Sequence, residues 1–284
     1  MSVAYVERLA HVAAMGLRLR DTATGRTVAE GLSVEILPPP PARATSAIRT
    51  PSGVFAAPRV QGLRAWELRD VGPDGLPVDV AAARIHGRVE VRDRFHSFHD
   101  FAVGADLPAD GLLANPCAGA SAPPDRRDRH LPLFSRPGRP VPAGFAAVRA
   151  RLLHAGDRRP AAYAALEVVP RPGAPAVRGI ADERGEVLVL FPYPPPLGLV
   201  GSPPIGTKRP LAQAAWTVAL RVFAPKAPPS PDELPDLCTF LDQSPATLVT
   251  TASPPAEIGE ATIEYGRELV LRSSPADSAL LVRP

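Results

Sequence analysis

The sequence of 284 residues predicts an all-β protein, and three observations lead to that prediction. Proline accounts for 37 residues, well above the usual ~5%, and proline is excluded from helix interiors and central strands. Short segments alternate apolar and polar residues, as half-buried strands do. A pattern of strand, polar turn, strand and D/T-x-x-G turn occurs twice, which predicts two similar β-sandwich domains.

The repeated pattern lies once in each half of the chain. The first copy is LRLRDTATGRTVAEGLSVEILPPP at 17–40, followed by SAIRTPSGVFAAP at 46–58. The second copy is VRARLLHAGDRRPAAYAALEVVPRP at 148–172, followed by VRGIADERGEVLVLFPYP at 177–194. We therefore expect an N-terminal sandwich at 1–113, a Pro- and Arg-rich linker or docking loop at 114–142, and a C-terminal sandwich at 143–284.

In the first half, turn residues separate the expected strands. Residues 3–15 either form a short helix or lead directly into the first strand. Thr24-Gly25 and Pro51-Ser52-Gly53 mark tight turns. Strands are expected at 17–20, 32–36, from 48, at 54–55, 65–69, 84–92 and 98–103. A total of about seven strands is typical of an immunoglobulin-like sandwich.

The second half shows the same alternation. Strands are expected at 148–152, 166–169, 187–191, 216–222, 237–241, 246–250, 269–272 and over the final ALLVRP. Asp182-Glu183-Arg184-Gly185 is a hairpin signal. The proline-rich segments 114–142 and 192–210 have no periodicity and are our candidate interfaces, because ordered loops lose less entropy when they bind. The first segment contains three large apolar residues, so we expect part of it to be buried in a contact: Leu131, Leu133 and Phe134.

Charge, apolar segments and cysteine content restrict the kinds of partner and the location that we expect for this protein. The net charge is +3, and arginines are interspersed with carboxylates along the whole length, so we expect no nucleic-acid partner. The N-terminus has no signal-peptide pattern, and no apolar run is long enough to span a membrane, so a cytoplasmic protein is expected. Cys117 and Cys238 are the two cysteines. Two unpaired thiols are favoured, and a disulfide between them stays open.

The search for chemistry yields no expected catalytic, cofactor-binding or metal-binding residue, and we do not expect an enzyme. His96, His99 and Asp100 lie close in FHSFHDF, but residues i and i+3 of a strand point to opposite faces. The segment GSPPIGTKR at 201–209 fails the order of a phosphate-binding loop. Trp66 and Trp216 are either core residues, which we favour, or aromatic platforms for a sugar.

Part of the second copy resembles the carboxypeptidase-regulatory-like (transthyretin-like) β-sandwich repeat. In that family a strand is followed by a T/A-D-x-x-G turn and an alternating apolar strand. Ala181, Asp182 and Gly185 match the turn, and Val187, Val189 and Phe191 match the strand. The resemblance covers about 50 residues here and more loosely 17–58. It implies a non-catalytic β-module.

A second resemblance concerns function. GLRLRDTATGRTV, RTPSGVFAAP, the turn followed by FPYP, and LVLRSSPADSALLVRP are together similar to proteins encoded with bacterial contractile phage-tail-like injection systems. This resemblance implies a structural or accessory component that docks to other subunits of a large symmetric assembly. Two alternatives stay open: a carbohydrate- or surface-binding module, and an enzyme whose site is assembled from scattered residues.

Overall fold

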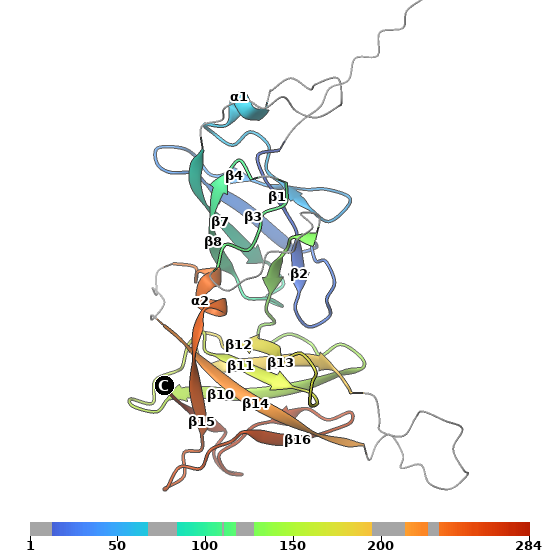
Figure 1. Ribbon diagram of the computed structural model, residues 1–284, viewed down its shortest axis with the longest axis vertical. Coiled ribbons are helices and arrows are strands. Elements are labelled where there is room, and N and C mark those ends of the chain that lie inside the picture. The colour runs from blue at the N-terminus through green and yellow to red at the C-terminus, as the bar shows by residue number, and fades with distance from the viewer. Residues whose placement is uncertain (1–12, 68–83, 110, 118–127, 195–213, 227–232) are drawn as a thin grey trace, which may run out of the picture.

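The computed structural model describes residues 13–67, 84–109, 111–117, 128–194, 214–226 and 233–284. Two groups of sheets are stacked along the long axis of an elongated molecule (Figure 1). The helices of the described residues are the short α1 (Arg64–Glu67) and α2 (Leu237–Leu241). None of them is long and apolar enough to cross a membrane. The prediction of an all-β protein is confirmed.

Three small sheets form the described part of the N-terminal half. Their strands are β4 (Thr45–Ser46), β3 (Leu32–Leu37), β7 (Ile85–Asp93) and β8 (Phe101–Leu107) in the first; β1 (Gly16–Leu17), β6 (Phe55–Ala56) and β5 (Ile48–Arg49) in the second; and β2 (Leu19–Asp21) with β9 (Leu131–Leu133) in the third. Along β3, Val34 and Ile36 lie opposite Val91 and Val89 of β7. All four are buried, so the alternation seen in the sequence sets the register of this sheet.

The C-terminal half is a β-sandwich. Its path of paired strands is β12 (Val177–Ile180), β11 (Ala165–Val169), β14 (Ala215–Pro225), β15 (Gln243–Val249), β18 (Ala279–Arg283), β10 (Phe145–His154) and β13 (Glu186–Pro192), with β16 (Glu260–Glu264) on β14 and β17 (Leu269–Val270) on β10. The first residues of β15 pair with β14, and its last residues pair with β18. This strand therefore passes from one layer of the sandwich to the other.

The same scheme of strand pairing occurs in both halves. β1 pairs with β6 as β10 pairs with β13. β3 pairs with β4 and β7 as β11 pairs with β12 and β14. β7 pairs with β8 as β14 pairs with β15, and the parallel pair β2–β9 corresponds to β10–β18. The duplicated sequence pattern thus corresponds to a duplicated order of pairing.

Two expected strands are wrong. The segment expected as a strand at 65–69 is helical as far as Glu67, and the one expected at 237–241 is α2. The carboxylate of Asp236 accepts a hydrogen bond from the N–H of Cys238 at 2.7 Å and caps α2. Leu237 and Phe240 are both fully buried. Their spacing of three residues places both side chains on one face of a helix, whereas in a strand they would point to opposite faces.

The turn at Asp182–Gly185 forms as expected but joins different partners. Gly185 has a φ of 77°, and its N–H donates to the carbonyl of Asp182 at 3.0 Å. The flanking strands β12 and β13 do not form a hairpin with each other, because β12 pairs with β11 and β13 with β10. The turn therefore links the two layers of the sandwich.

Two large hydrophobic cores occupy the two halves, beside a small cluster of Ala147, Leu188 and Leu190. The first large core contains residues of both halves. The second core is formed within the C-terminal half. The first core contains N-terminal residues together with Leu237 and Phe240 of α2 and Tyr163, Ala165 and Ile180. Leu131, Leu133 and Phe134 are also buried in the first core, which confirms that the proline-rich segment 114–142 packs onto the protein. Residues 118–127 of that segment, 195–210 of the second candidate interface and 3–12 lie outside the described residues.

Candidate functional site

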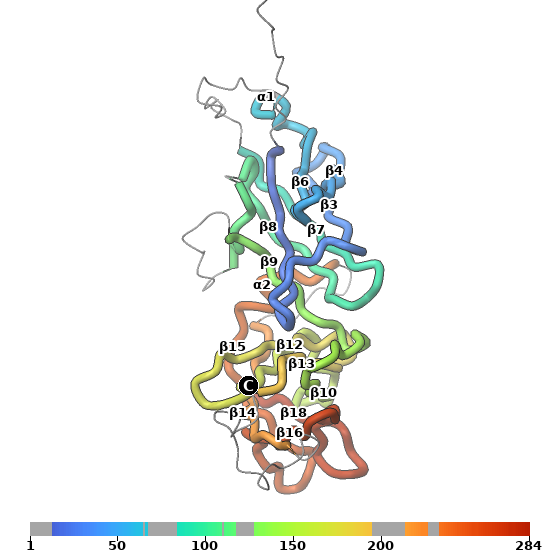
Figure 2. The backbone as a smooth tube through the Cα atoms, turned by 90° about the vertical axis from the view of Figure 1, so that its right-hand side faces the viewer, coloured from blue at the N-terminus to red at the C-terminus, as the bar shows by residue number. Residues whose placement is uncertain are grey.

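The candidate site is the junction between the two cores, where α2 lies between the stacked halves (Figures 1 and 2). The ring of Phe240 is its central contact. The ring centroid of Phe240 lies 5.8 Å from His99, 6.0 Å from Phe134 and 5.7 Å from Tyr163. Edge-on and tilted arrangements of this kind stabilise aromatic contacts beyond the buried area alone. A helix of the second half thereby completes the core of the first.

Polar contacts hold the segment around α2 from both sides. On the first half, the N–H of Ala102 in β8 donates to the carbonyl of Pro235 at 2.9 Å, and Arg88 donates to the carbonyl of Leu234 at 3.0 Å. On the second half, Arg178 donates to the carbonyls of Phe240 and Leu241 at 3.2 and 3.1 Å. The orphan carbonyls of the short helix are satisfied in this way.

A disulfide crosses the same junction. Cys117 of the first half and Cys238 of α2 are bonded, with Cα atoms 5.1 Å apart and 121 residues between them in sequence. The favoured expectation of two unpaired thiols is therefore wrong: the fold brings α2 against the end of the first half, which spacing in sequence cannot show. Disulfides persist in oxidising surroundings and are rare in cytoplasmic proteins, so this bond weighs against the expected cytoplasmic residence.

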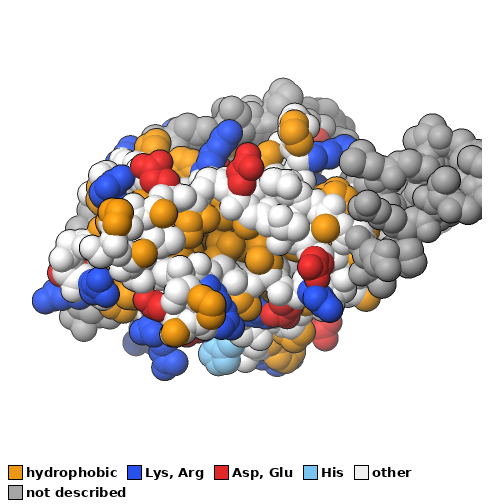
Figure 3. Space-filling view, turned by 90° about the horizontal axis from the view of Figure 1, so that it is seen from below, with side chains coloured by type: hydrophobic (Ala, Val, Ile, Leu, Met, Phe, Trp, Pro, Cys, Tyr) orange, Lys and Arg blue, Asp and Glu red, His pale blue; other side chains and the backbone are white. Residues whose placement is uncertain are grey.

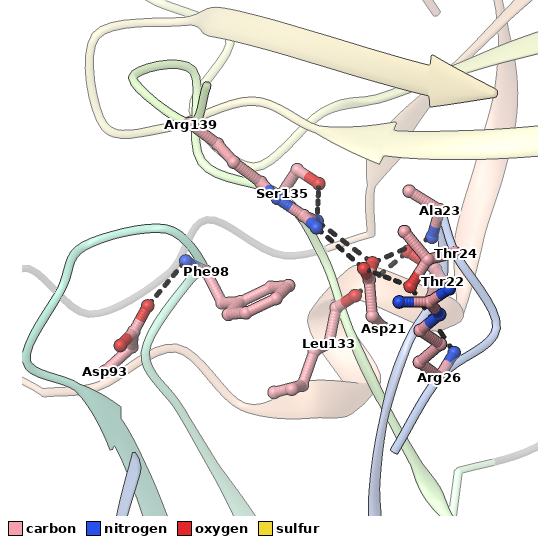
Figure 4. A network of polar contacts seen from close by, with 10 residues as sticks. All are labelled: Asp21, Thr22, Ala23, Thr24, Arg26, Asp93, Phe98, Leu133, Ser135 and Arg139. Carbon is pink, nitrogen blue, oxygen red and sulfur yellow. Dashed lines mark hydrogen bonds and ion pairs between the residues drawn. The ribbon is translucent and has the colours of Figure 1, made fainter. Parts of the chain in front are cut away.

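A buried ion pair holds the chain that leads from the first half to the second (Figure 4). Arg139 donates to both carboxylate oxygens of Asp21, at 3.0 and 2.7 Å, and to Ser135 at 2.7 Å. The side chains of Arg139 and Asp21 are 11% and 2% exposed. Burial would raise the pKa of Asp21, but the hydrogen bonds from Arg139 and Thr24 and the charge of Arg139 lower it overall. Asp21 therefore stays ionised inside the protein.

A second polar group lies at the junction near the turn of residues 182–185. Tyr163 donates to Glu183 at 3.1 Å, and Arg136 lies 3.7 Å from Glu183 and 3.2 Å from His96. Burial, and then the charge of Glu183, raises the pKa of Tyr163. Burial would raise the pKa of Glu183, but hydrogen bonds from its own backbone and from Tyr163, with the charge of Arg136, lower it. This group is a set of structural contacts that ties four segments together.

The structure separates the histidines and the aspartate noted in the sequence. His99 is 2% exposed, and its Nε2 donates to the carbonyl of Ile180 at 3.0 Å. His96 lies on the surface beside Arg136, and Asp100 accepts the backbone N–H of Asp93 at 2.8 Å. The three side chains do not converge on one point. Among the described residues, no group of three or more His, Cys, Asp or Glu side chains could hold a metal ion.

We expect the junction to loosen in mild acid because His99 is buried. Burial, and then the charge of Arg136, lowers the pKa of His99 from 6.5 to about 4. The unfolded chain binds a proton below pH 6.5 while the folded protein does not, so stability falls as the pH drops from 6.5 towards 4, by about 3 kcal/mol at most. Urea unfolding at several pH values measures this loss. The variant His99→Gln should lack the slope between pH 6.5 and 5, and an equal slope in both proteins would contradict the prediction.

The two tryptophans lie at the edges of the two cores. Trp66 of α1 is half-buried against the first core, and Trp216 of β14 is half-buried against the second. The ring of Tyr193 lies 5.6 Å from Trp216 and 4.8 Å from Tyr265, which makes an aromatic cluster of three half-buried rings. Figure 3, viewed from the end that carries β16, shows hydrophobic atoms gathered in a hollow with charged side chains around it.

An open depression lies beside β2 in the first half. Its volume is about 440 Å³, and it is lined by Arg18, Arg20, Gly25, Thr27, Asp128 and His130. The guanidinium of Arg20 donates to the carbonyl of Gly25 at 2.8 Å, so it supports the neighbouring turn. This group does not stand out in the sequence, because its members come from segments about 100 residues apart.

Comparisons with known proteins identify no family. No protein-family model and no curated protein matches the chain. Among solved structures, the TIE protein of Bacillus anthracis matches with 9% identity and a TM-score of 0.21, over 88% of this chain and 43% of that one. A protein of Bacteroides ovatus described as a candidate adhesin matches with 10% identity and a TM-score of 0.19, over 92% and 88% of the two chains. Similarities this low carry no argument about function.

Proposed function

We propose that this protein is a non-catalytic structural component of a contractile injection system or phage-tail-like particle and that it acts by docking to neighbouring subunits. The observation that carries the proposal is the way the two cores are joined. A disulfide, the inserted helix α2 and the buried pair Asp21–Arg139 all lie at or beside one junction. Because these contacts fix the two halves relative to each other, subunits bound at the two ends would be held at a constant distance and orientation.

In this proposal each core is one immunoglobulin-like or transthyretin-like domain. The duplicated order of strand pairing supports that interpretation, as do the two separate hydrophobic clusters. The assignment to an injection particle rests on the resemblance of the sequence segments named above. A particle released from its cell meets oxidising surroundings, which is compatible with the disulfide.

Sedimentation of a native lysate tests the proposal. In the strain that makes the protein, we expect the chain to travel with a complex far larger than its own 29.9 kDa, and we expect sheath, tube or baseplate genes beside its gene. Migration of the whole pool as a single free chain would refute the proposal. Symmetric assemblies hold many weak contacts at high effective concentration, so the complex should survive dilution of the lysate.

The aromatic cluster of Tyr193, Trp216 and Tyr265 favours a second candidate, a carbohydrate-binding module. The variant Trp66→Phe leaves Trp216 as the single tryptophan, so its fluorescence reports on that cluster alone. Because Trp216 packs on the second core, we expect its emission maximum to stay constant when soluble glycans are added. A saturable shift, lost in the additional variant Tyr193→Ala, would instead favour the carbohydrate-binding function.

A further inference from the structure

One aromatic side chain is well exposed on the described surface. The exposed large hydrophobic residues of the described segments are Ile48, Phe95 and Val270, at 61%, 57% and 40%. Phe95 is the aromatic member, and it lies at the tip of the loop between β7 and β8. Burial of an exposed phenylalanine ring in a partner is favourable because it removes apolar surface from water. The ring contributes most to binding when the loop holds it in a fixed position.

The backbone N–H groups of the loop are all hydrogen-bonded. Every N–H from Asp93 to His99 has an acceptor at 2.7–3.1 Å. Asp93 itself accepts four of them: its carboxylate accepts from residues 95, 97 and 98, and its carbonyl accepts from residue 96. The other three N–H groups, of residues 93, 94 and 99, donate to Asp100 Oδ1, Gly31 O and Phe134 O. Asp93 is 4% exposed, and its carboxylate accepts three of these hydrogen bonds from inside the loop. A loop held in this way loses little conformational entropy when it binds.

The position of the ring is set by its contacts. Phe95 lies directly over Gly31, where an added Cβ would be 2.2 Å from the ring. Gly31 also has a φ of 77°, so a side chain at residue 31 would displace the ring and strain the backbone. The guanidinium carbon of Arg94 lies 4.7 Å from the ring centroid, within the range of a cation–π contact. His96 has a φ of 54°, in the left-handed region that residues other than glycine rarely adopt. The fold thus maintains a strained turn that presents Arg94 and Phe95 together.

The charges around the loop indicate what kind of partner fits. Arg92 is paired with Glu90 at 2.8 Å, and Arg136 lies 3.7 Å from Glu183. Arg94 makes no ion pair with a described residue. One exposed ring with one guanidinium beside it fits a partner that has a small apolar pocket with a negative charge near it. Binding to an extended anionic surface, such as a nucleic acid, would require a row of cations on this protein. Aromatic and arginine side chains of this type commonly supply most of the energy of a protein interface.

We propose that the loop 94–97 is the docking anchor of this protein: Phe95 enters an apolar pocket of a neighbouring protein subunit, and Arg94 pairs with a carboxylate at the rim of that pocket. The inference rests on the proposed docking function and identifies the surface that performs it. It differs from the sequence-based expectation, which placed the interface in the segments 114–142 and 192–210.

Variants in the strain that makes the protein test the anchor. Phe95→Ala and Arg94→Glu are introduced separately, with Ile48→Ala as the matched control because Ile48 is equally exposed but lies on β5. The ratio of complex-bound to free chain is measured by sedimentation and immunoblotting. We expect both loop variants to lower this ratio at least tenfold and the control to leave it unchanged. Thermal unfolding of the purified variants confirms that each one folds.

Other outcomes separate the two proposals. If wild type sediments with a complex and Phe95→Ala does so equally, the anchor is refuted and the docking function stands. If wild type itself sediments as a free chain, both the docking function and the anchor are refuted. If purified wild type forms a dimer that Phe95→Ala abolishes, the loop binds a second copy of this chain, and the proposed pocket on a different subunit is overturned.

Discussion

Replacing Cys117 and Cys238 together by serine is expected to lower the free energy of unfolding by about 5 kcal/mol, because the bond closes a loop of 121 residues. The bond restricts the unfolded chain more strongly the longer the loop it closes. It also keeps α2 against the first core, where Leu237 and Phe240 are fully buried. Guanidinium unfolding followed by circular dichroism measures the difference.

Reductant provides the control for this experiment. Wild type in dithiothreitol should unfold at the same denaturant concentration as the double variant, and the double variant should not respond to dithiothreitol. Overlapping curves for oxidised wild type and the variant would show that the bond adds nothing to the junction. A first half that unfolds at lower denaturant than the second would locate the loss in the core that α2 completes.

The variant Arg139→Met is expected to cost about 3–5 kcal/mol, because it leaves the buried carboxylate of Asp21 without its partner. Arg139 also packs 4.6 Å from the ring centroid of Phe98, and methionine keeps part of that apolar contact. Since Arg139 helps to lower the pKa of Asp21, the stability that it contributes is present at neutral pH and is lost in acid, so the difference between variant and wild type should shrink as Asp21 becomes protonated. Urea unfolding at neutral pH and acid titration measure the two effects.

Two variants control for this prediction. Asp21→Asn combined with Arg139→Met removes both charges. The amide oxygen of asparagine can still accept from the N–H of Ala23, and its NH2 group can donate to the hydroxyl of Thr24, where Asp21 uses one oxygen for each. The double variant should therefore recover part of the lost stability. Arg267→Met breaks an exposed pair with Glu264, whose side chains are 77% and 52% exposed, and should cost less than about 1 kcal/mol. Equal losses in Arg139→Met and Arg267→Met would contradict the assignment of a buried pair.

The sequence predicted most strands because local alternation decides which residues of a strand are buried. Val34, Ile36, Val187 and Val189 are buried as their spacing indicates. It also predicted the turns at Gly25, Gly53 and Gly185, each of which has a positive φ. These features depend on neighbours within a few residues, so a single sequence is sufficient to find them.

The junction could not be predicted, because it depends on contacts between distant segments. LCTFL at 237–241 is too short to show helical periodicity, and only its burial by the first core makes one face of α2 apolar. Arg139 and Asp21 lie 118 residues apart, and nothing local marks them as partners. The Phe95 loop falls between the strands expected at 84–92 and 98–103, and nothing local shows that Asp93 and Gly31 together form its turn.

Because α2 lies late in the chain, the first core can be completed only near the end of translation. Leu237 and Phe240 belong to the first core but are translated more than 100 residues after β8, its last strand in the four-stranded sheet. A nascent chain that has reached residue 150 lacks the residues of α2 that complete the first core. Ribosome-bound chains ending before residue 237 should therefore depend on chaperones, and they should be released from them once the helix has emerged.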